Sequence, residues 1–105
     1  EELNLSGNAL TSQGQLGQLS RLRRLLLDDN RLRTFSLRGF RRLELLSLCN
    51  NELRHFPAHA ADAPHLQVLH LGGNRVRAGF ADALPHLRAL RRLDVGANGL
   101  RLALA

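Results

Sequence analysis

A spacing of leucines and asparagines recurs along almost the whole of this 105-residue chain. It is clearest in residues 43–53, LELLSLCNNEL, where leucine fills the first, fourth, sixth and eleventh positions and asparagine the ninth. The asparagine position is filled in five copies of the frame, by Asn8, Asn30, Asn51, Asn74 and Asn98. Their spacings are 22, 21, 23 and 24 residues. A repeat of about 20–29 residues predicts a stack of similar coils.

The centre of the frame, L-x-L, alternates in the way that a half-buried strand requires, because successive side chains of a strand point to opposite faces. Each copy therefore predicts a short strand whose leucines point into a core and whose variable residues point out. One copy buries too little apolar surface to be stable alone. Stacked copies share a continuous core, so their stability is a sum over neighbouring coils.

The asparagine column requires a separate explanation, because a buried amide without hydrogen-bond partners costs about 1–3 kcal/mol. We expect each of these side chains to bond backbone groups of its own coil and of a neighbouring coil. Such a column is a structural ladder and is not a site for chemistry.

The frame resembles that of leucine-rich repeats, as a mixture of the typical subclass and a subclass of 22-residue repeats. The resemblance implies an α/β, right-handed solenoid with a parallel β-sheet on the concave side and helical, 3-10 or irregular returns on the convex side. Residues 80–90 have the most helical spacing, and Pro57 predicts an extended or turn start to its return. Gln13 stands where an aliphatic residue is usual. We expect residues 1–105 to be one segment of about five repeats, an uncapped fragment of a longer array.

The composition narrows the class of protein. No run of 18 apolar residues is present, so no transmembrane helix is predicted. The net charge is +6 and all 15 basic residues other than histidine are arginine, a bias that GC-rich coding also produces. Cys49 is the single cysteine, which favours a reducing compartment and a cytoplasmic location. A secreted or receptor array could also lack cysteines in its central repeats.

Motifs for catalysis and for metal binding are absent from the sequence. His55 and His59 are four residues apart with His65 nearby, but Pro57 lies between the first two, so they are interpreted as solvated loop residues. Cys49 and His70 fall on different variable columns and match no protease signature. We therefore expect no enzyme activity, no cofactor and no metal.

The main candidate site is the exposed face of the sheet, since curved solenoids bind partners on such surfaces. An apolar centre with a charged rim is typical of a protein interface. The predicted partner-binding residues on this concave face are Arg24, Leu26, Asp28, Leu45, Ser47, Cys49, Val68, His70, Arg92 and Asp94.

A second candidate is an edge of arginines that follow the asparagine ladder, formed by Arg31, Arg33, Arg54, Arg75, Arg77 and Arg101. Two interpretations of this edge remain open: a solvated edge that serves solubility, and an anion site for acidic protein, phosphoinositide or nucleic acid. Single-stranded nucleic acid would normally need aromatic stacking as well, which this chain with four Phe does not favour. The sequence thus predicts a non-catalytic protein-binding module, with an anion-binding module or a regulatory segment of a larger enzyme or receptor as alternatives.

Overall fold

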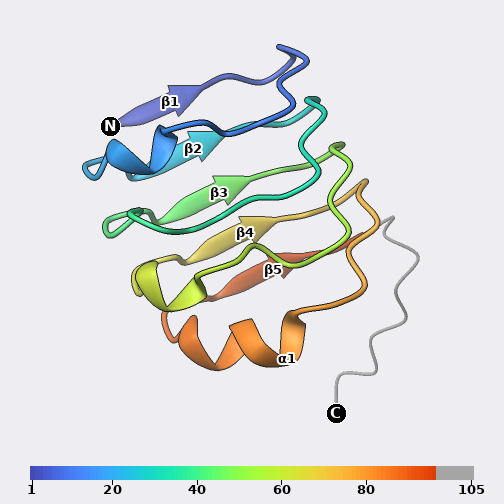
Figure 1. The fold of residues 1–105 in the computed structure, drawn as a ribbon. Coiled ribbons are helices and arrows are strands. Elements are labelled where there is room, and N and C mark those ends of the chain that lie inside the picture. Colours follow the sequence, from blue (N-terminus) through green and yellow to red (C-terminus); the bar gives the residue numbers. More distant parts are fainter. Residues whose placement is uncertain (97–105) are drawn as a thin grey trace.

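Five parallel strands form one open sheet in the computed structural model, which describes residues 1–96. The strands are β1 (Glu2–Asn4), β2 (Arg24–Leu26), β3 (Leu45–Ser47), β4 (Val68–His70) and β5 (Arg92–Asp94). Their order in the sheet is their order in the sequence, so each coil of chain lies beside the next one (Figure 1). The predicted leucine-rich-repeat solenoid with a parallel sheet is therefore confirmed.

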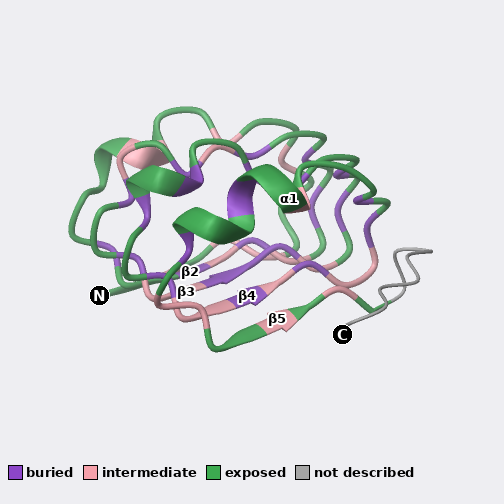
Figure 2. Ribbon diagram, turned by 90° about the horizontal axis from the view of Figure 1, so that it is seen from below, coloured by how far each residue is buried: buried purple, intermediate pink, exposed green. Residues whose placement is uncertain are grey.

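The register of the sheet aligns the same frame position in every coil. Leu3, Leu25, Leu46, Leu69 and Leu93 are successive partners across the strands. The middle three are fully buried, whereas Leu3 and Leu93 in the outer strands are half-buried. A continuous leucine core thus runs between the sheet and the returns, because buried residues, purple in Figure 2, lie both in the strands and in the returns.

The returns between the strands differ from coil to coil. They contain η1 (Leu16–Gln18), η2 (Ala60–Asp62), α1 (Phe80–Ala83) and η3 (Leu84–His86). Residues 80–90, whose apolar residues have the most helical spacing, contain α1, the one α-helix among the described residues. Pro85 lies in the first turn of η3. The second return, residues 31–44, contains turns but no helix, and it packs Phe35 against Phe40 with ring centroids 5.7 Å apart.

The start of the third return is extended, as Pro57 predicts. Two residues that flank Pro57 form isolated parallel bridges with adjacent coils. Ala58 pairs with Ser36 of the preceding coil, and His55 pairs with Ala78 of the following coil. The convex side therefore has a short ladder of its own, opposite the main sheet.

Asparagines of the frame join neighbouring coils just after β2, β3 and β4. The Nδ2 group of Asn51 donates to the carbonyls of Leu27 and Leu48, both at 3.0 Å, and its Oδ1 accepts from the Leu32 N–H at 3.1 Å. Asn30 and Asn74 make equivalent bonds. These three side chains are buried, whereas Asn8 is exposed and Asn98 lies outside the described residues.

Candidate functional site

The predicted partner-binding residues lie on the open face of the sheet, and the register groups most of them into two columns. The first column is Glu2, Arg24, Leu45, Val68 and Arg92, and the second is Asn4, Leu26, Ser47, His70 and Asp94. The helical returns cover the opposite face of the sheet (Figure 2). We call the open surface formed by these two columns, together with Asp28 and Cys49, the concave face.

An apolar patch occupies the middle of the concave face. It consists of Leu26, Leu45 and Val68, all half-buried. Leu45 and Val68 are direct partners in the register of β3 and β4, and Leu26 lies diagonally from Leu45 on the neighbouring strand. Diagonal neighbours in a sheet are still within reach of long side chains. The three side chains therefore form one contiguous surface.

Charged side chains flank the apolar patch along both columns. Arg24 lies beside Glu2, with 4.0 Å between guanidinium and carboxylate, and His70 lies 3.8 Å from the Asp94 carboxylate. Arg92, at the far end of the first column, is exposed and makes no ion pair with any residue in 1–96. The face thus presents an apolar centre between two ends that carry charges of both signs.

Asp28, Ser47 and Cys49 form a hydrogen-bonded cluster at the end of the apolar patch. One oxygen of Asp28 accepts from the Ser47 hydroxyl at 2.6 Å and from the Cys49 N–H at 2.8 Å. Ser47 is only 5% exposed, although it lies on the predicted site's face. Its hydroxyl is committed to the neighbouring coil, so Ser47 shapes the face and has little surface for a partner.

The thiol of Cys49 is partly buried in this cluster. Burial raises the pKa of the thiol above its ordinary value, and the nearby carboxylates of Asp28 and Asp94 raise it further. Hydrogen bonds from the Ser47 hydroxyl and the Gly72 backbone lower the pKa and offset part of this effect. The group is therefore a protonated surface thiol at neutral pH, without the activation that a nucleophile requires.

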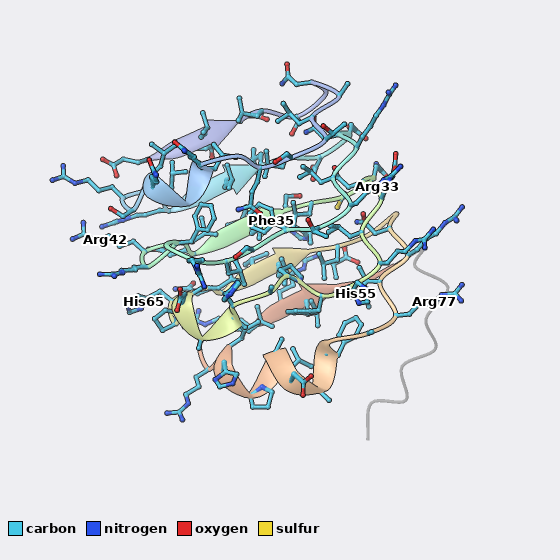
Figure 3. All side chains as sticks on the ribbon, in the orientation of Figure 1. Arg33, Phe35, Arg42, His55, His65 and Arg77 are labelled. Atoms are coloured by element: carbon cyan, nitrogen blue, oxygen red, sulfur yellow. The ribbon has the colours of Figure 1, made fainter. Side chains whose placement is uncertain are left out.

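The predicted arginine edge lies along the carboxyl ends of the strands. Arg33 and Arg77 project from it together with His55, on the opposite side of the molecule from Arg42 and His65 (Figure 3). A groove of about 1070 Å³ follows this edge, and Arg33, Arg54, Arg75 and Arg77 line it. Arg31 does not line the groove, and Arg101 lies outside the described residues.

Glu52 and His55 also line the groove, and the sequence frame did not single them out as members of this site. Glu52 follows the ladder asparagine of its coil directly, as Arg31 and Arg75 do in theirs. That shared position was the signal that could have identified it.

The histidines of the third return do not gather into a metal site. His59 bonds Ser36 through Nδ1 at 2.7 Å and Arg38 through Nε2 at 3.2 Å, so both of its ring nitrogens have partners in the preceding coil. Within residues 1–96, no three or more His, Cys, Asp or Glu side chains are placed to hold a metal ion. No helix in the same range is long and apolar enough to cross a membrane.

Comparison with known proteins identifies the repeat. A family model described as "Leucine rich repeat" matches residues 22–76 and again 41–100. The chain is 36% identical, over 99% of its length, to a protein of Dictyostelium discoideum named "Probable inactive serine/threonine-protein kinase". It is 34% identical, over 95% of its length, to "Podocan-like protein 1" of Homo sapiens.

The matches cover 5% of the Dictyostelium protein and 22% of the human one, so the similarity concerns only a part of each relative. The residues that the family model matches include β2 to β5, the buried leucine core and four of the five frame asparagines, Asn30, Asn51, Asn74 and Asn98. The chain belongs to the leucine-rich-repeat family.

Proposed function

We propose that this chain is a non-catalytic module that binds a protein partner on its concave face. The observation that carries the proposal is the contiguous patch of Leu26, Leu45 and Val68 on the open face of the sheet. Leucine-rich-repeat domains are in general protein-interaction modules, which supports a protein as the partner.

The arrangement of the face follows the anatomy of protein interfaces, in which a desolvated apolar centre lies inside a polar rim. Burying apolar area stabilises a complex by about 25 cal/mol per Å² before the costs of association are counted. A patch of only three aliphatic residues can therefore supply a central contact but not the whole affinity. We expect the exposed charges of Arg24, Arg92 and Asp94 to supply orientation and selectivity, because rim charges mainly steer association.

The experiment compares the chain with a Leu45→Asp/Val68→Asp double variant. Each of the two chains is immobilised, and the proteins that it retains from extracts of the source cells are quantified. Each candidate partner is then purified, and its affinity for the unchanged chain and for the double variant is measured by calorimetry. Placing two carboxylates in the patch should lower the affinity for a genuine partner at least tenfold. A tenfold loss corresponds to about 1.4 kcal/mol of binding free energy at 25 °C. Circular dichroism and thermal melting verify that the double variant folds.

The matched control is an Ala61→Asp/Ala81→Asp double variant, because both residues are exposed, lie outside the concave face and receive the same two added negative charges. It should bind the purified partner with unchanged affinity. A partner that binds the folded Leu45→Asp/Val68→Asp variant as tightly as the unchanged chain would show that the concave face is not the binding surface.

A further inference from the structure

The groove along the arginine edge is separate from the concave face and has a different chemistry. Two positions of each coil, one and three residues after the ladder asparagine, flank the last aliphatic residue of the frame and line up along this edge. In three successive coils they hold five arginines and one glutamate, as Arg31 and Arg33, Glu52 and Arg54, and Arg75 and Arg77. No other part of the frame repeats one charged residue type in this way.

Backbone hydrogen bonds fix these positions relative to one another. The Glu52 N–H donates to the Leu32 carbonyl at 2.8 Å, the Arg75 N–H to the Leu53 carbonyl at 2.8 Å, and the Arg77 N–H to the Arg54 carbonyl at 3.1 Å. Parallel chains joined in this way lie about 4.8 Å apart. The arginines therefore start from a rigid, closely spaced backbone, although their side chains extend into solvent.

The groove has a clear excess of positive charge. Its one carboxylate, Glu52, lies 3.6 Å from the Arg33 guanidinium and offsets that residue. Arg54, Arg75 and Arg77 make no ion pair with any carboxylate of residues 1–96. Holding like charges this close is unfavourable unless an anion is present. Three guanidinium groups with no ionic partner in their own coils remain available to a ligand.

We propose that this groove binds an extended acidic peptide segment that carries several aspartate or glutamate side chains. The guanidinium group has a fixed fork of donors that fits a carboxylate through two parallel hydrogen bonds. The volume of about 1070 Å³ exceeds what one small anion occupies and suits several residues of chain. The N–H groups of Glu52, Arg75 and Arg77 already donate to carbonyls of neighbouring coils, so at these positions recognition falls to the side chains.

The lining of the groove argues against nucleic acid as the ligand. Among residues 1–96, no aromatic ring other than the His55 imidazole lines it, so bases of a single strand would find little to stack on. Proteins that bind duplexes commonly neutralise about 6–10 phosphates. Here three unpaired arginines face the ligand, a number that matches a short run of carboxylates better.

The test measures fluorescence anisotropy of a labelled hexaglutamate peptide titrated with the chain at about 50 mM salt, where surface electrostatics are weakly screened. The groove variant is Arg54→Glu/Arg77→Glu. The matched control is Arg41→Glu/Arg42→Glu, which makes the same change in net charge at exposed residues away from the groove, on the edge where Figure 3 shows Arg42. All three proteins are compared by thermal melting, and Arg54→Gln/Arg77→Gln replaces the groove variant if charge reversal prevents folding.

The proposal expects the groove variant to lose at least tenfold in affinity for hexaglutamate and the control to lose less than twofold. Equal losses in the two variants would mean that net charge alone attracts the peptide, and the groove would not be a site. A 20-nucleotide oligothymidylate that binds more tightly than hexaglutamate, with the same dependence on Arg54 and Arg77, would overturn the assignment of an acidic peptide. Neither outcome depends on the concave face, so failure here is distinguishable from failure of the proposed function.

Discussion

Gln13 pairs with the backbone of Ser36 in the next coil through both ends of its side-chain amide. Its Oε1 accepts from the Ser36 N–H at 2.6 Å, and its Nε2 donates to the Ser36 carbonyl at 2.9 Å. Ser36 forms an isolated bridge with Ala58 on its other side. The Gln13 amide thus takes the place of a further strand at the edge of the convex ladder.

This pairing predicts that Gln13→Leu destabilises the chain, even though leucine is the residue that the repeat frame would favour there. The substitution leaves a half-buried N–H and carbonyl of Ser36 without their protein partners, which costs about 1–3 kcal/mol. The melting temperature should fall by about 4 °C for each kcal/mol. Gln18→Leu is the control, because Gln18 is exposed and should tolerate the change. A Gln13→Leu chain as stable as the unchanged one would show that apolar packing compensates for the lost pair.

The strands, their register and the columns of residues on the sheet could be predicted from the sequence, because they follow from the repetition of one coil. The columns of the concave face required only the alternation of the strand and the alignment of the frame, and the register has Arg24 beside Leu45 and Leu45 beside Val68. These relationships depend on the backbone and on the repeat period.

Contacts that depend on a specific side chain in one coil meeting another coil could not be predicted. Ser47 is buried, and its hydroxyl donates a hydrogen bond to Asp28, which lies 19 residues earlier in the sequence. Gln13 departs from the frame, and its partner Ser36 is 23 residues away. The frame gives no information about either pair, since each is a property of two variable positions and of their rotamers.

The asparagine ladder predicts a large difference between two chemically identical substitutions. Asn51→Ala removes a buried amide that bonds three carbonyls and one N–H, and the free energy of unfolding should fall by about 2–4 kcal/mol. Asn8→Ala removes an exposed side chain and should cost less. The exposed substitution Arg54→Ala should change stability by about 0.5 kcal/mol or less. Urea denaturation measures all three, and equal midpoints for Asn51→Ala and Arg54→Ala would contradict the role of the ladder.

Gly17 and Gly39 meet backbone to backbone between the first and second returns. A Cβ atom added to Gly39 would overlap the Gly17 carbonyl oxygen, and Gly39 has φ +86°, a conformation that L-residues rarely adopt. We expect Gly39→Ala to destabilise the chain by about 3 kcal/mol, from strain in the backbone and from the clash. Gly14→Ala separates the two effects, because Gly14 has φ +55° but open space around its Cα. Its cost should be limited to about 1 kcal/mol, and equal losses in chemical denaturation would mean that the close approach is unimportant.

The thiol of Cys49 predicts a pH dependence of both reactivity and stability. Burial, assisted by the carboxylates of Asp28 and Asp94, holds its folded-state pKa above the value in the unfolded chain. The folded chain therefore retains the thiol proton more tightly, so this stabilisation is complete below the unfolded pKa and is lost as the pH rises through the folded pKa. Because the thiolate is the reactive form, iodoacetamide should alkylate the folded chain more slowly than the urea-unfolded chain near pH 8.

The variant Asp28→Asn assigns part of this shift to charge. An asparagine oxygen can still accept from Ser47 and from the Cys49 N–H, so the geometry of the cluster is retained while the negative charge is removed. The pKa of Cys49 should then fall, and the pH profile of alkylation should move to lower pH. Its position would still lie above that of the unfolded chain, because burial is the largest cause of the shift. If the alkylation profile of the folded, unsubstituted chain coincided with that of the unfolded chain, the thiol would be fully solvated in the folded state, which would contradict its burial.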